Sequence, residues 1–365
     1  MIIRFGVGAT LGPLIGGLFT DYVSWRWCFY INLPIGGATL LAFLLLFREG
    51  EKGEERMPYF QRIQKLDLLG NTLFLGASVM LFTVLELAAD GEPWSSAQSI
   101  GLLAGFGVTA IIFIIWQSQR QDKALIPPRL VKQRTVAASC AIAITIYGAL
   151  LLHTYFLPIW FQGILGTTAF QSGVNMLPYF IVNAFFSLGA GIFVSVVGYY
   201  VPPAIVGNII ATVGCGMLTT LSADSSKAMW AGYETLVAAG FGLAIQQGLT
   251  AVQTTLQGDD VSMGTALVVS SQSFGGAVLV SIGNNVFLNR VQEAGTSNAT
   301  AGVDVKQIIS AGATEFRNSL PPEAVEEFLD IYNDGLRTVF IAAVPLAGLA
   351  FLFSCILPWK SVKSR

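Results

Sequence analysis

The sequence is poor in charged residues and in residues that bind metals. Charged side chains make up 12% of its 365 residues, whereas soluble domains average about 25%. There is one histidine, and the four cysteines lie far apart with no CxxC spacing. No ligand set for zinc or haem can be assembled from these residues, so we expect no metal and no cofactor. The cysteines are most simply buried small apolar side chains.

Several functional classes are excluded by what is missing. The net charge of −2 gives no global basic field, so nucleic acid is not an expected partner. The sequence has no GxxxxGK[ST] segment, and its early Gly-x-Gly has neither a preceding strand nor a third glycine in place, so we expect no nucleotide. The HExxH and GxSxG patterns are missing too, which argues against an enzyme.

What the sequence has instead is apolar residues in long runs. Hydrophobic residues make up 53% of the chain, and the mean hydropathy is +0.64. About ten runs are long enough to cross a bilayer, which takes about 17–25 residues. They lie near 2–20, 27–47, 68–88, 99–118, 135–157, 172–197, 202–222, 229–252, 262–288 and 336–357. Continuous runs of this length predict helices, so the fold class is an all-α polytopic membrane protein.

The loops between these runs predict the orientation of the chain. The segments 48–65 and 120–134 carry five Lys and Arg residues each, whereas 89–98 and 161–171 carry none. Positive loops stay in the cytoplasm, so both basic loops and the C-terminus are predicted to be cytoplasmic. The loop 289–335 then lies outside.

Two features stand out in this outer loop. It contains the glycosylation sequon that begins at Asn298. Residues 321–332 carry proline in their first turn and predict a short surface helix before the last span.

The first run contains an unusual glycine pattern. Gly8, Gly12 and Gly16 recur every four residues, with Pro13 and Gly17 beside them. In a soluble helix each interior glycine costs about 1 kcal/mol and proline about 3 kcal/mol. In a membrane helix a stripe of small residues allows close helix approach, and a proline kink is tolerated. We therefore predict a packing and bending device, with Gly12 and Gly16 facing another helix.

This stretch, Gly8-Ala-Thr-Leu-Gly-Pro-Leu-Ile-Gly-Gly17, resembles the antiporter motif gxxxGPxxGG of major facilitator drug:proton antiporters. Further segments are similar to the fourteen-span members, which include fungal toxin and multidrug efflux pumps. These segments are 24–37, 155–162, 232–240, 246–247, 264–269 and 312–317. The similarity extends over nearly the whole chain, and the joint occurrence of the motifs is specific.

The resemblance implies a partial major facilitator fold. Residues 1–47 would be the last two helices of the N-terminal bundle, followed by a cytoplasmic loop at 48–67. Residues 68–118 would be two inserted helices, followed by a second cytoplasmic loop at 119–134. Residues 135–365 would form the C-terminal six-helix bundle, including the outer loop 289–335. The family's first four spans have no counterpart in this sequence.

Two ionisable residues within spans are candidates for proton coupling, because such groups are costly in a membrane. They are His153 and Glu234, which the topology places at similar depth on the outer side, on two helices that line the central cavity in the family fold. The alternative is that both are hydrated at the headgroup boundary. Glu86, near the outer end of an inserted span, is more simply the edge of a solvated loop.

Aromatic and amide side chains are candidates for lining a substrate cavity, since such groups bind planar apolar compounds. Helix–helix hydrogen bonding or aromatic core packing explains them equally well. The candidates are Tyr147, Tyr155, Phe156, Tyr233, Gln246, Gln247 and Gln272.

The function implied is proton-coupled efflux (antiport) of small amphipathic organic compounds such as toxins or drugs. The expected partners are such a compound, protons and the lipid bilayer, and the full-length protein is expected to be a monomer. The expected location is the plasma membrane, with the vacuolar membrane as the alternative. The alternative function is a truncated, non-transporting membrane component that lacks the first four helices.

The topology can be tested by labelling at Asn298. A membrane-impermeant reagent should reach a cysteine introduced there only from outside the cell, because the loop 289–335 is predicted to be extracellular. Labelling from the cytoplasmic side alone would contradict the predicted topology.

Overall fold

The computed structural model describes residues 2–46, 67–294 and 322–363, and within them the regular elements are helices. A single isolated bridge joins Tyr199 and Ser361. The α-helices are α1 (Ile2–Tyr22), α2 (Trp27–Tyr30), α3 (Asn32–Leu46), α5 (Leu68–Ala89), α6 (Ala97–Arg120), α7 (Pro128–Val131), α8 (Arg134–Gly163), α9 (Ala169–Asn175), α10 (Leu177–Val197), α11 (Val201–Leu218), α12 (Lys227–Ala244), α13 (Gln247–Thr255), α14 (Asp259–Ala294) and α17 (Pro322–Ile356). A 3-10 turn, η1 (Gln121–Lys123), follows α6.

The helices confirm the all-α polytopic fold class. Among the described residues, nine helical segments are long and apolar enough to cross a membrane. The first predicted run corresponds to α1, which is 21 residues long but is not among the nine. Two runs are each divided into two helices, one between α9 and α10 and the other between α12 and α13.

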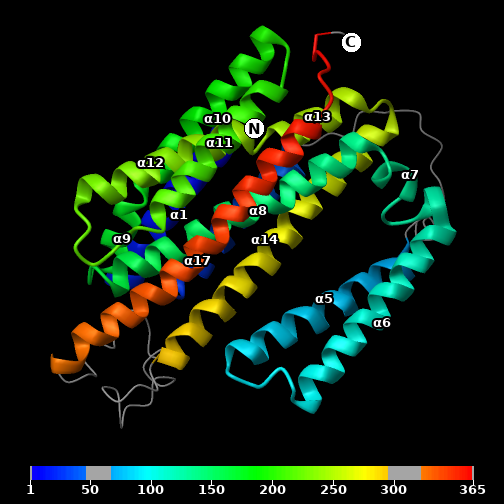
Figure 1. The fold of residues 1–365 in the computed structure, drawn as a ribbon. Helices are drawn as coiled ribbons and strands as arrows, with labels where there is room; N and C mark the ends of the chain where they lie inside the picture. Colours follow the sequence, from blue (N-terminus) through cyan, green and yellow to red (C-terminus); the bar gives the residue numbers. More distant parts are fainter. Residues whose placement is uncertain (1, 47–66, 295–321, 364–365) are drawn as a thin grey trace.

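The helices α8, α10, α11, α12, α14 and α17 form the main bundle, with α8 packed between α14 and α17 (Figure 1). The largest buried cluster of apolar side chains lies within it. The α5–α6 hairpin packs along α14, and α1 packs against α9 and α10. The hairpin and α1 therefore contact different helices of the same bundle.

The last helix differs from the prediction. The short surface helix expected at 321–332 is the first part of α17, which continues without interruption to Ile356. Gly335, taken as the end of the loop, is a packing position instead. A Cβ there would come within 2.9 Å of Val291 and 3.1 Å of Phe287 on α14. The glycine lets α17 approach α14 closely, so it does not end the helix.

The α5–α6 hairpin is held to α14 by a hydrogen bond and by aromatic contacts. The Asn285 side chain donates a 2.7 Å hydrogen bond to the Leu85 carbonyl. The Phe274 ring lies 5.4 Å from Phe74 and 6.1 Å from Phe82, centroid to centroid. A buried amide paired with a backbone carbonyl is a strong positional restraint where no water competes for it.

At the other end of the hairpin, Asp67 joins three segments of the chain. Its carboxylate accepts hydrogen bonds from the Gly70 amide at 3.0 Å, the Trp116 indole at 2.8 Å and the Gln117 amide at 3.0 Å. The Leu125 amide donates a fourth at 3.2 Å. Partial burial raises the pKa of the Asp67 carboxyl, but these bonds together outweigh it and hold the pKa below its usual value.

A second polar contact joins the loop after α6 to α14. The Arg129 guanidinium makes two 2.7 Å hydrogen bonds to the Asp260 carboxylate and is also paired with Asp122. These acidic partners raise the pKa of Arg129 above its already high usual value. The pair is exposed, so it contributes more to geometry than to stability.

The close helix contacts of α1 occur at positions other than the predicted Gly12 and Gly16. Close approach occurs at Gly17, where a Cβ would lie 2.6 Å from the Ala169 carbonyl oxygen. It also occurs at Gly173 of α9, where a Cβ would lie 2.7 Å from the Pro13 carbonyl oxygen. The Asp21 carboxylate accepts a 2.8 Å hydrogen bond from the Phe170 amide beside this contact. The motif therefore packs against α9 through Pro13 and Gly17.

The expected contact at the other three glycines of the motif is not found. A Cβ at Gly8, Gly12 or Gly16 would meet no described atom within 4 Å. The face of α1 that carries them lies away from α9 and α10, so no close contact is described at Gly12 and Gly16 and their packing against another helix stays a prediction. Pro13 is accommodated within a continuous helix.

This difference between neighbouring glycines predicts opposite effects of the same substitution. Gly17→Ala should lower the thermal unfolding midpoint of the purified protein in detergent, because overpacking costs about 1–3 kcal/mol. Gly12→Ala is the matched control, and it should leave the midpoint unchanged or raise it because alanine favours helix. An equal loss in both variants would contradict the packing seen at Gly17.

Candidate functional site

The main bundle contains buried polar atoms that have no hydrogen-bond partner in the structure. Such atoms are uncommon in native proteins and each one needs an explanation. Among the described residues they are Ser139 Oγ, both ring nitrogens of His153, Thr154 Oγ1, Tyr179 Oη, Asn208 Oδ1, both carboxyl oxygens of Glu234 and Gln247 Oε1.

Glu234 is the one acidic side chain in this set. It lies in the second turn of α12, which begins after Ser226, whose hydroxyl accepts a hydrogen bond from the Met229 amide. Its side chain is on the same face as Trp230 and Val237, one turn before and one turn after it, and is 0% exposed. The α12 face is therefore apolar except at Glu234, and the carboxyl is inside the bundle rather than hydrated at its edge.

His153 is also 0% exposed, on α8. Its ring stacks on Phe340 at 5.8 Å and lies 5.9 Å from Phe241. The contacts of His153 are with the Phe340 and Phe241 rings, and the common depth of His153 and Glu234 stays a prediction. The surroundings of His153 are those of an aromatic core residue.

Two residues that the sequence prediction missed are Tyr179, which lies near Glu234, and Thr154, which lies beside Tyr179. The Tyr179 hydroxyl on α10 is next to the Thr154 side chain on α8 and within electrostatic reach of Glu234. Tyr179 is 1% exposed. The sequence did contain a signal, since Tyr179, Asn183 and Ser187 recur every four residues in an otherwise apolar run and so share one face of α10.

The predicted cavity residues do not come together as one lining. Phe156 is 0% exposed and packs on Phe287 at 6.0 Å, so it belongs to the core. Tyr155 beside it is 53% exposed on the surface of the bundle. Tyr147 is half-buried against α14, 3.2 Å from where a Cβ on Gly276 would lie.

The remaining candidates fall into two groups. Gln246 and Gln247 lie at the break between α12 and α13, where the Gln247 amide donates a 2.9 Å bond to the Leu243 carbonyl. This leaves the buried Oε1 of Gln247 without a partner. Tyr233 on α12 and Gln272 on α14 are half-buried. Asn298, the glycosylation candidate, lies outside the described residues.

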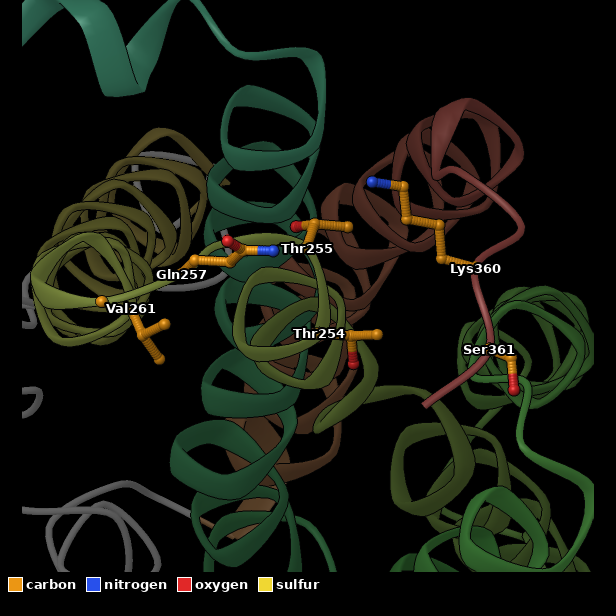
Figure 2. Close-up of a pocket in the computed structure, with 7 residues that line it drawn as sticks. Thr254, Thr255, Gln257, Val261, Lys360 and Ser361 are labelled. Atoms are coloured by element: carbon orange, nitrogen blue, oxygen red, sulfur yellow. The ribbon is translucent and has the colours of Figure 1, made fainter. Parts of the chain in front are cut away.

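A separate polar cavity of about 960 Å³ lies where α13 ends, α14 begins and the C-terminal segment passes (Figure 2). Its lining residues are Thr254, Thr255, Gln257, Gly258, Val261, Lys360 and Ser361. The C-terminal segment is held there by a 2.8 Å hydrogen bond from the Val362 amide to the Gly198 carbonyl. This cavity contains none of the predicted substrate residues.

Among the described residues, no group of three or more His, Cys, Asp or Glu side chains is arranged to hold a metal ion. The site available for chemistry is therefore the buried carboxyl of Glu234 with the neighbouring hydroxyls of Tyr179 and Thr154. Such a group can bind and release a proton and can exchange hydrogen bonds.

The chain is similar in sequence to known membrane transporters. The sequence profile described as Major Facilitator Superfamily matches residues 3–280. The chain is 37% identical over 362 residues to the MFS-type efflux pump MFS1 of Arthroderma benhamiae, covering 99% of this chain and 67% of that protein.

Two further relatives show the same pattern. The MFS-type transporter astH of Aspergillus oryzae is 40% identical over 99% of this chain and 64% of its own length. The efflux pump roqT of Penicillium rubens is 39% identical over 98% of this chain and 66% of its own length. The chain thus spans about two thirds of the length of these relatives. With a matching profile over most of its length, the chain belongs to the Major Facilitator Superfamily, a family of membrane transporters and not of enzymes.

Proposed function

We propose that this protein carries out proton-coupled efflux of small amphipathic organic compounds, taking up protons in exchange. The relatives named as efflux pumps support the direction of transport. The partners are then the exported compound, protons and the bilayer. We propose the plasma membrane as the site, with the C-terminus in the cytoplasm and the full-length protein a monomer.

The observation that carries this proposal is the burial of Glu234 without a partner. Both carboxyl oxygens are buried and unbonded. An ionised carboxylate in such surroundings costs several kcal/mol, so the neutral, protonated form is favoured in this conformation. When the surroundings open to water the ionised form is no longer penalised, and the proton can leave. A carboxyl that alternates between these environments couples proton movement to a conformational cycle.

The energy source follows from the same chemistry. A proton that crosses the membrane releases about 2.3 kcal/mol per 100 mV of membrane potential. In the rocking-bundle scheme of this family, protonation of a buried carboxyl in one bundle changes the relative stability of the two access states. Tyr147, Tyr233, Gln246, Gln247 and Gln272 are proposed to contact the substrate, as aromatic and amide groups that accept varied organic compounds.

The decisive variant is Glu234→Gln in the full-length protein. Glutamine keeps the size and the hydrogen-bonding head but removes titration, so the dependence of efflux on an imposed proton gradient should be lost. Substrate binding, measured by fluorescence or scintillation proximity, should change less than about threefold, since the change removes the proton but not the shape. Efflux is measured in proteoliposomes with and without the gradient.

Glu86→Gln is the matched control, because Glu86 is an exposed glutamate in α5. This variant should retain gradient-driven efflux at the wild-type level. Undiminished proton coupling in Glu234→Gln at normal protein abundance would remove Glu234 from the mechanism.

A further inference from the structure

Three helices of the main bundle each carry one buried polar group near the Tyr179 hydroxyl. The groups are Thr154 Oγ1 on α8, Tyr179 Oη on α10 and the Glu234 carboxyl on α12. Each is buried away from solvent, and the Glu234 carboxyl has no hydrogen-bond partner, whereas the Tyr179 and Thr154 hydroxyls lie next to each other without a well-formed bond. Unsatisfied polar groups that lie close together can form hydrogen bonds after a small movement of their side chains.

The packing of α10 on α12 sets Tyr179 level with Glu234. The Asn183 amide donates a 3.4 Å hydrogen bond to the Ala238 carbonyl. One turn further along, a Cβ on Gly242 would lie 3.0 Å from the Ser187 amide nitrogen.

The Asn183 bond and the Ser187 contact each join residues 55 positions apart, although the atom nearest a Cβ on Gly242 is the Asn183 carbonyl oxygen at 2.5 Å, and Tyr179 and Glu234 are also 55 positions apart. The helices α10 and α12 run in the same direction, since α11 returns between them. The constant offset therefore places Tyr179 beside Glu234, one turn before the Asn183 bond.

Thr154 provides the third position. It lies beside the Tyr179 hydroxyl. Four residues later α8 contains Pro158, which has no N–H to bond the Thr154 carbonyl. Thr154 thus offers a hydroxyl oxygen next to a carbonyl that lacks its helical partner. The hydroxyl oxygen is the acceptor for the single hydrogen of the tyrosine.

We propose that Tyr179 is the positioning residue for Glu234, and that its hydroxyl changes partner between Glu234 and Thr154 as the proton is bound and released. The inference rests on the proposed role of Glu234 as the proton carrier. With Glu234 ionised, Tyr179 O–H donates to the carboxylate. When a proton from water binds the carboxylate, Glu234 O–H donates to the Tyr179 oxygen, and Tyr179 O–H turns to Thr154. The same proton returns to water when the site opens on the other side.

Other titratable groups on the helices packed around α12 are few. Among the described residues they are Cys215 on α11, near the Tyr179 hydroxyl, and His153 on α8, beside Phe241. Neither places a charge beside the carboxyl in this structure. The protonation of Glu234 should therefore respond to Tyr179 more than to any of them.

The experiment follows protonation of Glu234 directly. The full-length protein is titrated with pH while the infrared C=O stretch of protonated carboxyl groups is recorded, and the Glu234 band is identified by its loss in Glu234→Gln. Tyr179→Phe should move the midpoint of this band upward by about one pH unit, because the ionised form loses a hydrogen bond to a charged group. Thr154→Val should move it downward, because the protonated arrangement loses its acceptor.

Tyr155→Phe is the matched control, since Tyr155 is a neighbouring but exposed tyrosine, and it should leave the midpoint unchanged. Loosened packing would admit water and lower the midpoint, so an upward shift in Tyr179→Phe separates a hydrogen-bonding role from a structural one. An unchanged or lowered midpoint in Tyr179→Phe would overturn the pairing, and so would a wild-type Glu234 band that does not titrate.

The infrared experiment tests the role of Tyr179 and the transport experiment tests the proposed function, so one hypothesis can be overturned while the other is kept. A midpoint that shifts in Tyr179→Phe, combined with efflux that ignores the proton gradient, would keep the pairing and overturn the proposed function. Proton-coupled efflux that depends on Glu234, combined with an unshifted midpoint, would keep the function and overturn the role of Tyr179.

Discussion

A polar group inside a membrane bundle has no water to bond with, so the protein must supply its partner. The described bundle meets this constraint at several places. Asn208 donates to the Ser354 hydroxyl at 2.7 Å, Trp160 donates to Asn333 at 2.9 Å, and Asn285 donates to the Leu85 carbonyl at 2.7 Å. Each bond joins two helices and fixes their register. Among the buried groups without a hydrogen-bond partner in the described bundle, the Glu234 carboxyl would be the most costly to ionise. For this reason we propose that its hydrogen-bond partner changes as the proton is bound and released.

Close helix packing prepares the surroundings of that carboxyl. A Cβ on Gly207 would lie 2.7 Å from the Gly240 carbonyl oxygen, and one on Gly214 would lie 2.7 Å from Val237. These glycines draw α11 against the stretch of α12 that follows Glu234, which excludes solvent from the carboxyl. Small residues therefore contribute to function here through burial, because tight backbone contact raises the cost of an ionised carboxylate.

The sequence predicted what depends on local pattern. Continuous apolar runs located the helices, and rarity in an apolar span singled out His153 and Glu234. The sequence could not predict which face of a helix packs against another helix. A repeat of every four residues shows that side chains share one face of a helix, but it does not show which neighbouring helix that face meets. Gly12 and Gly17 carry the same signal, yet only Gly17 is packed closely. Tyr179 was missed for the same reason, since its role depends on a contact with a helix 55 residues away.

The protonated, water-excluded state of Glu234 is most directly tested by carbodiimide labelling followed by mass spectrometry. Dicyclohexylcarbodiimide partitions into apolar surroundings and reacts with protonated carboxyl groups, whereas water-soluble carbodiimides reach only exposed ones. Glu234 should be modified by the apolar reagent and spared by the soluble one, and the exposed Glu86 should react with the soluble reagent. Modification of Glu234 by the soluble reagent to the same extent as Glu86 would show that the carboxyl is hydrated and would contradict its burial as the basis of coupling.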